Sequence, residues 1–249
     1  MPQSQQETQR TLNEKSHGKW LLDHDPEQTW GWGTPAGKLR AQRRASLIAQ
    51  GARLEKGMRV MEIGCGTGAF TERFLDFGVH ITAVELSQDL ISLALTRNLP
   101  KDRVHFLTSR FEDVASKDGF DAIIGSSVLH HLEIDRAFQN IFRLLKPGGL
   151  LSFAEPNLLN PQIFMERRFR SYFPHISKDE IAFCRWPLEK KLRQIGFDQV
   201  KIVPFDWLHP AVPKPLIPVV KTAEWFLERC PLIHEFAGSL CIQACRPRN

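Results

Sequence analysis

The sequence of 249 residues contains no apolar run long enough to cross a bilayer. Its longest nearly apolar stretch, "PAVPKPLIPVV" at 210–220, is interrupted by a lysine and four prolines, whereas a membrane-spanning helix needs roughly 20 apolar residues. The first residues, "MPQSQQETQRTLNEKS", lack the apolar core of a signal peptide and are polar and aperiodic. We therefore expect no transmembrane helix, a disordered segment over residues 1–18 and a cytoplasmic protein.

Cysteines are few and show no paired C-x-x-C spacing, so a structural zinc site is not expected. The five are Cys65, Cys184, Cys230, Cys241 and Cys245, an odd number that fits reduced thiols. The excess of basic residues is also small, because 33 lysines and arginines against 28 aspartates and glutamates give a formal charge of +5. This balance permits an anionic partner without demanding one, and we expect no metal and no nucleic acid.

Apolar runs of four to six residues alternate with helical patterns between Arg59 and Phe153, which is typical of βαβ units and a parallel sheet. Strands are expected at 59–63, 81–86, 104–108, 120–126, 150–155, 197–207 and 239–247. Ser87 is a helix N-cap, and Pro-Gly-Gly at 147–149 and Gly196 are helix stops. The predicted fold is α/β: a Rossmann-like, doubly wound, mostly parallel seven-stranded sheet with helices on both faces, an antiparallel last strand and lid insertions.

We expect residues 19–249 to form a single domain. Its parts are an N-terminal lid and helix (19–54), a cofactor-binding core (55–157), an insertion over the active site (158–185) and C-terminal strands (186–249) with a Pro-rich amphipathic insertion (208–238). In that last insertion, Val220, Ala223, Phe226 and Leu227 recur at helical spacing with charges on the other side. Such a helix covers the sheet edge, or it is a wall for a greasy substrate or a surface that rests on a membrane.

The strongest local signal is "VMEIGCGTGAF" at 60–70, a strand followed by G-x-G-x-G and a helix. Glycines at 64, 66 and 68 let a nucleotide-like ligand approach the main chain beside free helix N–H groups. The loop is one residue shorter than the dinucleotide pattern G-x-G-x-x-G. Glu62 would repel a pyrophosphate and suit an ammonium group, while Glu85 is placed to accept from two ribose hydroxyls. A ribose with an amino-acid tail is the implied ligand.

The motifs "EIGCGTG", "AVELS", "FDAIIGSSVLHHLE" and "LKPGGLLSFAEPN", spread over about 55–157, resemble the class I S-adenosylmethionine-dependent methyltransferases. The resemblance is to the methyltransferase-domain group that includes quinone and many small-molecule methyltransferases. It implies that the glycines wrap methionine and ribose, that Glu85 holds the ribose diol and that Ser126 faces the cofactor. Arg110 stands where the group often has an adenine-binding aspartate, so Phe111 and Glu112 are the alternatives for stacking and accepting. The expected cofactor-binding residues are Glu62, Gly64, Cys65, Gly66, Gly68, Glu85, Leu86, Arg110, Phe111, Ser126, Trp32 and Arg40.

Methyl transfer from a sulfonium is an in-line displacement that needs no metal, and it needs a general base only if the acceptor must lose a proton. Candidates for the base are His130, His131, Glu155, Tyr172, His175 and His209. We expect His131, Glu155 and Tyr172 to be catalytic. A histidine packed beneath the sheet rim and a turn-forming role for Glu155 remain the alternatives.

The stretch "WGWGTP" at 30–35 is expected to form a glycine-hinged lid, with Trp30 or Trp32 shielding the sulfonium or the acceptor. Arg40 or Arg44 would reach the cofactor carboxylate or an anionic substrate. The segment "GSSVLHHL" lacks the Asn/Asp-Pro-Pro-aromatic motif of base N-methyltransferases, which leaves an apolar or lipid-linked small molecule as the acceptor and peripheral membrane contact as an option. A NAD(P)-dependent oxidoreductase and a cofactor-binding scaffold without catalysis are the competing hypotheses.

Overall fold

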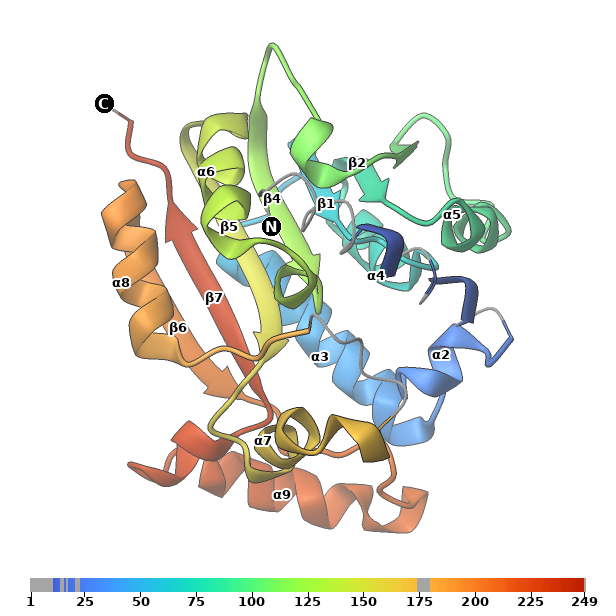
Figure 1. The fold of residues 1–249 in the computed structure, drawn as a ribbon, viewed down its shortest axis with the longest axis vertical. Helices are drawn as coiled ribbons and strands as arrows, with labels where there is room; N and C mark the ends of the chain where they lie inside the picture. The colour runs from blue at the N-terminus through green and yellow to red at the C-terminus, as the bar shows by residue number, and fades with distance from the viewer. Residues whose placement is uncertain (1–10, 14–15, 17, 21–22, 174–179, 249) are drawn as a thin grey trace.

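The computed structural model describes residues 11–13, 16, 18–20, 23–173 and 180–248. It contains a seven-stranded sheet in the order β3-β2-β1-β4-β5-β7-β6, in which β7 runs antiparallel to both of its neighbours and the other pairs are parallel (Figure 1). The strands are β1 (Arg59–Ile63), β2 (His80–Glu85), β3 (Val104–Thr108), β4 (Phe120–Ser126), β5 (Leu145–Pro156), β6 (Asp198–Phe205) and β7 (Ser239–Cys245). The predicted fold class is confirmed.

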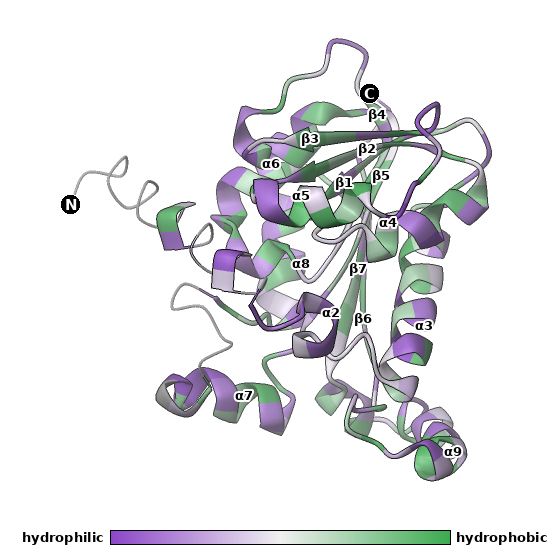
Figure 2. Cartoon of the chain, turned by 90° about the vertical axis from the view of Figure 1, so that its right-hand side faces the viewer, coloured by the Kyte–Doolittle hydropathy of each residue, from purple (hydrophilic) through white to green (hydrophobic). Residues whose placement is uncertain are grey.

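Helices cover both faces of the sheet (Figure 2). On one face, α3 (Pro35–Gly51), α4 (Ala69–Phe74) and α5 (Gln88–Leu95) bury apolar side chains such as Ile48, Phe74 and Ile91 against β1, β2 and β4. On the other face, α6 (Ile134–Leu144) and α8 (Arg185–Ile195) do the same with Phe138 and Leu192. Each core combines a strand's buried residues with one apolar stripe of a helix, as layered α/β folds require.

Two predicted helix ends are confirmed and one is shifted. The Ser87 side chain accepts the N–H of Leu90 at the start of α5, and Gly196 ends α8 in the left-handed conformation. In contrast, α6 stops at Leu144, before Pro-Gly-Gly, because the chain enters β5 at Leu145. A register shift between Phe120 and Ala122 of β4 accommodates the extra residues of β5.

Further helices lie before or between these elements along the chain. They are α2 (Pro26–Thr29), α7 (Pro161–Arg168) and α9 (Ile217–Leu227), with the short 3₁₀ segments η1 (Leu75–Phe77), η2 (Phe111–Asp113), η3 (Leu129–His131), η4 (Arg170–Tyr172), η5 (Lys214–Leu216) and η6 (Ile233–Phe236). No described helix is long and apolar enough to cross a membrane. Most of the segment expected to be disordered, 1–18, lies outside the described residues, and Thr11–Asn13 are helical.

The predicted helix in the C-terminal insertion is present as α9, but its polar and apolar sides are placed differently from the expected stripe. Ala223 and Phe226 are exposed, whereas Glu224 is buried. The physical reason is Arg43 on α3, which forms ion pairs of 2.6 Å with both Glu224 and Glu228. The carboxylates of Glu224 and Glu228 therefore face the protein, Ala223 and Phe226 face outward, and Val220 packs inward beside Ile217.

Candidate active site

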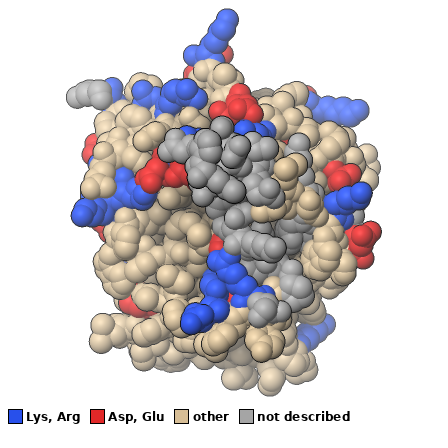
Figure 3. Space-filling view, viewed as in Figure 1, with Lys and Arg blue, Asp and Glu red and all other residues tan. Residues whose placement is uncertain are grey.

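A cavity of about 1100 Å³ opens at the carboxyl ends of the parallel strands. Its walls come from the loops after β1, β2, β3, β4 and β6, from α2 and the start of α3, and from α7. This is the edge at which open α/β sheets bind their ligands. Basic and acidic side chains are interspersed on the face seen in Figure 3, so no field of one sign covers that view.

The glycine loop after β1 forms the floor of the cavity. Gly64 and Gly66 have φ angles of +66° and +52°, and both line the cavity. A Cβ on Gly64 would lie 2.4 Å from Val128 Cγ2, and one on Gly66 would lie 3.2 Å from the ring of Trp30. Glycine is thus required by conformation and by close approach at both positions.

Glu85 ends β2 beside this loop. Its carboxylate accepts the N–H groups of Gly66 at 3.1 Å and Ser87 at 2.9 Å. Burial raises the pKa of Glu85, and these hydrogen bonds lower it in part. Because a carboxylate has about four lone-pair sites, two backbone donors leave acceptor capacity for a diol.

Residues after β2 and β3 line the neighbouring wall. Leu86, Arg110, Phe111 and Glu112 all face the cavity, and Phe111 is buried. The Arg110 Nε atom lies 3.7 Å from a Glu112 carboxylate oxygen. This wall combines an aromatic face with a carboxylate beside a guanidinium, which suits an adenine ring.

The N-terminal segment packs over the glycine loop. Trp30 lies against Gly66, and the ring of Trp32 meets Phe70 edge-on at 5.4 Å. The segment is anchored by Glu27 of α2, which pairs with Arg97 and accepts a hydrogen bond from Thr67 at 3.2 Å. Trp30 and Trp32, from the turn between α2 and α3, thus form part of the cavity wall.

Two arginines of α3 reach the cavity and are already paired. Arg40 makes a bidentate contact with Asp206, its shortest distance being 2.6 Å. Arg44 is buried and donates to the Ser126, Ser127 and Ser239 hydroxyls and to the carbonyl of Ala154, at 2.8–3.1 Å. Burial lowers the pKa of Arg44 to about 10, so it stays charged at neutral pH.

A buried dyad links His130 to Glu155. The Nδ1 atom of His130 lies 2.7 Å from Glu155 Oε2, while Oε1 of the same carboxylate accepts the N–H groups of Val128 and Leu129. Burial would raise the pKa of Glu155, but the hydrogen bond from His130 and the backbone donors bring it below its usual value. Burial also lowers the pKa of His130, so at neutral pH a neutral ring donates Nδ1–H to an ionised carboxylate.

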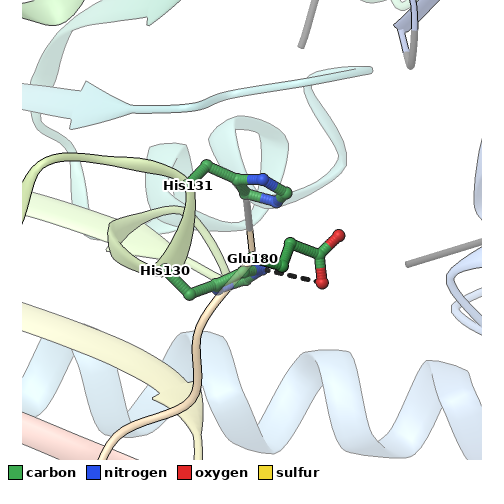
Figure 4. Close-up of side chains that lie close together, drawn as sticks. All are labelled: His130, His131 and Glu180. Carbon is green, nitrogen blue, oxygen red and sulfur yellow. Dashed lines mark ion pairs between the residues drawn. The ribbon is translucent and has the colours of Figure 1, made fainter. Parts of the chain in front are cut away.

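The other ring nitrogen of His130 belongs to a second cluster (Figure 4). His130 Nε2 lies 4.0 Å from Glu180 Oε2, and the His131 ring lies 4.1 Å from the His130 ring. Ligand atoms of the three side chains lie within 4.8 Å of one another, so this group could hold a metal ion. Arg167 is ion-paired with Glu180 at 2.9 Å and would compete for that carboxylate.

Residues 61–151 match a protein family described as a methyltransferase domain. A curated relative, the ubiquinone biosynthesis O-methyltransferase of Coxiella burnetii, is 30% identical over 187 residues, which cover 71% of this chain and 75% of that enzyme. The chain belongs to the class I S-adenosylmethionine-dependent methyltransferases. The resemblance seen in the sequence motifs is thereby confirmed, and the enzyme uses S-adenosylmethionine as its cofactor.

Two solved methyltransferase structures share the fold. The phosphoethanolamine N-methyltransferase 2 of Haemonchus contortus, in complex with S-adenosyl-L-methionine, has a TM-score of 0.61 and 17% identity, covering 88% of this chain and 55% of that chain. The N-methyltransferase NodS of Bradyrhizobium japonicum, in complex with S-adenosyl-L-homocysteine, has a TM-score of 0.58 and 18% identity, covering 86% and 89%. These likenesses confirm the Rossmann-like methyltransferase fold.

The cavity of this methyltransferase fits its cofactor. Gly64 and Gly66 leave a cradle that a Cβ would fill, Glu85 offers acceptor sites for a ribose diol, and Phe111 offers a ring face for adenine. Cys65 also lines the cavity, and burial raises the pKa of its thiol well above the usual value, which suits a neutral space-filler. Ser126 faces the cavity while its hydroxyl accepts from Arg44 Nε at 2.9 Å.

Two residues predicted to bind the cofactor lie outside the cavity lining of the methyltransferase. Glu62 is buried behind the loop, where its carboxylate accepts the Thr71 hydroxyl at 2.6 Å. Gly68 begins α4 with φ +76°, and a Cβ there would face Ala94 and Arg97 on the side of α5. Both residues shape the loop from behind, because strand alternation and the helix start turn them away from the ligand.

Of the three residues predicted to be catalytic, the structure places only His131 in the cavity lining. His131 lines the cavity as expected, but Tyr172 is 80% exposed and is not among the cavity residues. Glu155 is fully buried, and its carboxylate already accepts three hydrogen bonds, so it can position His130 but cannot reach an acceptor. His209 lines the cavity, and His175 lies outside the described residues.

Sequence reasoning missed Asp206 and Glu180. Both are buried and line the cavity, Asp206 holding Arg40 and Glu180 holding Arg167. Asp206 directly follows β6 and has a φ of +82°, a left-handed conformation that is strained for a non-glycine residue. Its position at a strand end could have identified Asp206 as a candidate site residue. Glu180 lies in an insertion with no regular sequence pattern, so the sequence offered no such signal.

Proposed function

We propose that this methyltransferase methylates a hydroxyl oxygen of an apolar or lipid-linked small molecule, with His130 as general base. The observation that carries the proposal is the Glu155–His130 dyad at the cavity wall. An amine acceptor can attack without a base once it is neutral, whereas a hydroxyl gains from losing its proton during attack. A histidine held by a buried carboxylate, with its second nitrogen toward the cavity, supplies that function.

Each residue around His130 has a role that follows from its position. Glu155 fixes the tautomer of His130, so that Nε2 carries the lone pair that accepts the proton of the acceptor hydroxyl. The resulting imidazolium would lie between the carboxylates of Glu155 and Glu180, both of which stabilise its charge. S-adenosylmethionine, when bound, supplies a methyl group already activated on a sulfonium. His131, on the Glu85 side of His130, would pack between the base and the cofactor.

The size and lining of the cavity support a large acceptor. Its volume of about 1100 Å³ lies just above the roughly 300–1,000 Å³ of typical small-molecule sites, which leaves room for an acceptor beside the cofactor. Apolar walls away from the glycine loop come from Leu132, Ile163, Trp207 and Leu208. The relative from Coxiella burnetii is named as an O-methyltransferase of ubiquinone biosynthesis, which favours an oxygen acceptor of the quinone type. We further propose peripheral contact with a membrane, and cytoplasmic location stays a prediction.

A methyl-transfer assay with tritiated S-adenosylmethionine tests the proposal. The acceptors are a catechol, the same catechol carrying a prenyl chain, and an amine with the same chain. We expect transfer to the prenylated catechol, and His130→Gln should lower kcat/KM about 10²–10⁴-fold, the usual contribution of a general base. Tyr172→Phe is the control, because Tyr172 is exposed outside the cavity and the change keeps the dyad. Preference for the amine, or an unchanged kcat/KM in His130→Gln, would contradict the proposal.

A further inference from the structure

The outer surface of α9 is unusually apolar for an exposed helix. Leu216, Val219, Ala223 and Phe226 follow one another at spacings of three, four and three residues and are all exposed, which places them on one outward stripe. Val219 and Phe226 are 66% and 57% exposed. Beyond the end of α9, Leu232 and the η6 residues Ile233 and Phe236 are further exposed apolar side chains.

The exposed charged residues of this surface are all basic. Between residues 211 and 236, all of which are described, the acidic side chains are Glu224, Glu228 and Glu235, and each is held by an arginine of another segment. The basic residues of the same stretch, Lys214, Lys221 and Arg229, are exposed. The lower edge of the molecule in Figure 3, where α9 lies in Figure 1, shows few charged side chains. The surface therefore presents apolar residues with a cationic margin.

Trp225 stands at one side of the stripe and is 52% exposed. The Arg229 guanidinium lies over its ring, 3.9 Å from the centroid, and the ring of Phe226 meets it edge-on at 4.8 Å. An aromatic body with a cationic tip is the combination that favours the boundary between lipid acyl chains and headgroups.

We propose that this surface, comprising Leu216, Val219, Ala223, Trp225, Phe226 and the η6 residues, docks on a bilayer of anionic phospholipids. Apolar side chains enter the headgroup boundary, and Lys214, Lys221 and Arg229 contact lipid phosphates. A second protein chain is the less favoured occupant, because burying this margin of like charges against a copy of itself would be repulsive.

Docking would bring the cavity close to its acceptor, and in this respect the inference rests on the proposed function. The inner side of α9 contacts the cavity wall through a small cluster of Ile217, Leu208 and Ala36, and Leu208 itself lines the cavity. The segment from Trp207 to Pro210 lines the cavity and leads directly to η5 and α9. Only this small cluster would then separate the bilayer surface from the cavity that receives the lipid-linked acceptor.

Co-sedimentation of the full chain with vesicles tests this proposal. Vesicles of phosphatidylcholine with phosphatidylglycerol are compared with vesicles of phosphatidylcholine alone. We expect binding to the anionic vesicles that weakens with added salt. The double variant Trp225→Glu/Phe226→Glu should bind at least tenfold more weakly, since it removes two inserted aromatic side chains and adds two negative charges.

A matched control variant is Trp186→Glu/Leu95→Glu, which also replaces two exposed apolar side chains by glutamate, at positions of 51% and 55% exposure on α8 and α5. It should bind vesicles like the wild type. Absence of binding to anionic vesicles, equal loss in both variants, or a dimer in sedimentation equilibrium that only the α9 variant dissolves would overturn the proposal. Turnover of a short-chain, water-dispersed catechol should be unchanged in the α9 variant. Failure of that reaction in the wild type would contradict the proposed function and leave the docking result unaffected.

Discussion

Replacing Glu155 by Gln is the most discriminating test of the active site. The carboxylate accepts the N–H groups of Val128 and Leu129 through one oxygen and the Nδ1–H of His130 through the other. In Glu155→Gln the amide oxygen can keep the two backbone donors, which turns the NH₂ group toward His130. His130 Nδ1 must then accept, and its hydrogen moves to Nε2, the atom proposed to take the acceptor's proton.

The expected effect is large on catalysis and moderate on stability. A ring with Nε2–H cannot accept a proton, so kcat/KM should fall about 10²–10⁴-fold. Loss of a charge-assisted hydrogen bond should lower the free energy of unfolding by about 1.5–3 kcal/mol. The affinity for S-adenosylmethionine should be unchanged, because Glu155 lies outside the cavity lining.

Steady-state kinetics over pH 5 to 9, with cofactor binding by calorimetry and urea unfolding, measure these effects. Burial and the neighbouring His131 lower the pKa of His130 below 6.5, so wild-type kcat/KM should fall on acidification with a midpoint below 6.5. Glu155→Gln should lose this acid limb together with its activity. Glu180→Gln is the comparison, since it keeps the dyad and removes only the second carboxylate beside the imidazolium: its kcat/KM should fall less than that of Glu155→Gln, and its acid limb should remain. A folded Glu155→Gln variant that keeps kcat/KM within about threefold of the wild type would refute the role of the dyad.

Three further predictions address the loop and the lid. Burial raises the pKa of Glu62 from 4.5 to about 7. The free energy of unfolding should therefore fall as pH rises from 4.5 to 7, by up to about 3 kcal/mol at about 1.4 kcal/mol per pKa unit. Urea unfolding at pH 5 and 8 measures this slope, which Glu62→Gln should remove. Gly64→Ala should cost about 2–5 kcal/mol in thermal unfolding, because the new Cβ meets Val128 at φ +66°, and adding Val128→Ala should recover part of the loss; no recovery would exclude the clash. Trp30→Ala should weaken S-adenosylmethionine binding about tenfold by calorimetry, since its ring packs on Gly66, while the same affinity as wild type would show that it is no lid.

Much of the fold follows from local sequence patterns. The strand at Arg59–Ile63, the N-cap at Ser87 and the stop at Gly196 were all predictable, because each depends on residues that are neighbours in the chain. The cavity residues of the glycine loop and Glu85 were predictable for the same reason, since they occupy fixed places after strands β1 and β2. The start of β5 was not, because pairing with β4 extends it through a glycine-rich segment.

The remaining errors concern side chains whose roles depend on distant partners. The sequence cannot show that Glu155 meets His130, 25 residues away, or that Arg43 turns Glu224 inward across the molecule. Helical periodicity grouped Val220 with Ala223 and Phe226, but the ion pair of Arg43 with Glu224 leaves Ala223 and Phe226 facing outward, while Val220 packs inward. Glu62 was misplaced because strand alternation sets its direction only once the burial of both faces of the sheet is known.

The position of Arg44 has a consequence for how binding of the cofactor and binding of the acceptor affect each other. Its single guanidinium binds Ser126 and Ser127 at the end of β4 and Ala154 and Ser239 at the ends of β5 and β7. A ligand that displaces the serines on one side must change the hydrogen bonds available to the other. We therefore expect the affinities for cofactor and acceptor to be coupled, and thermodynamic reciprocity then requires each ligand to change the affinity for the other by the same factor.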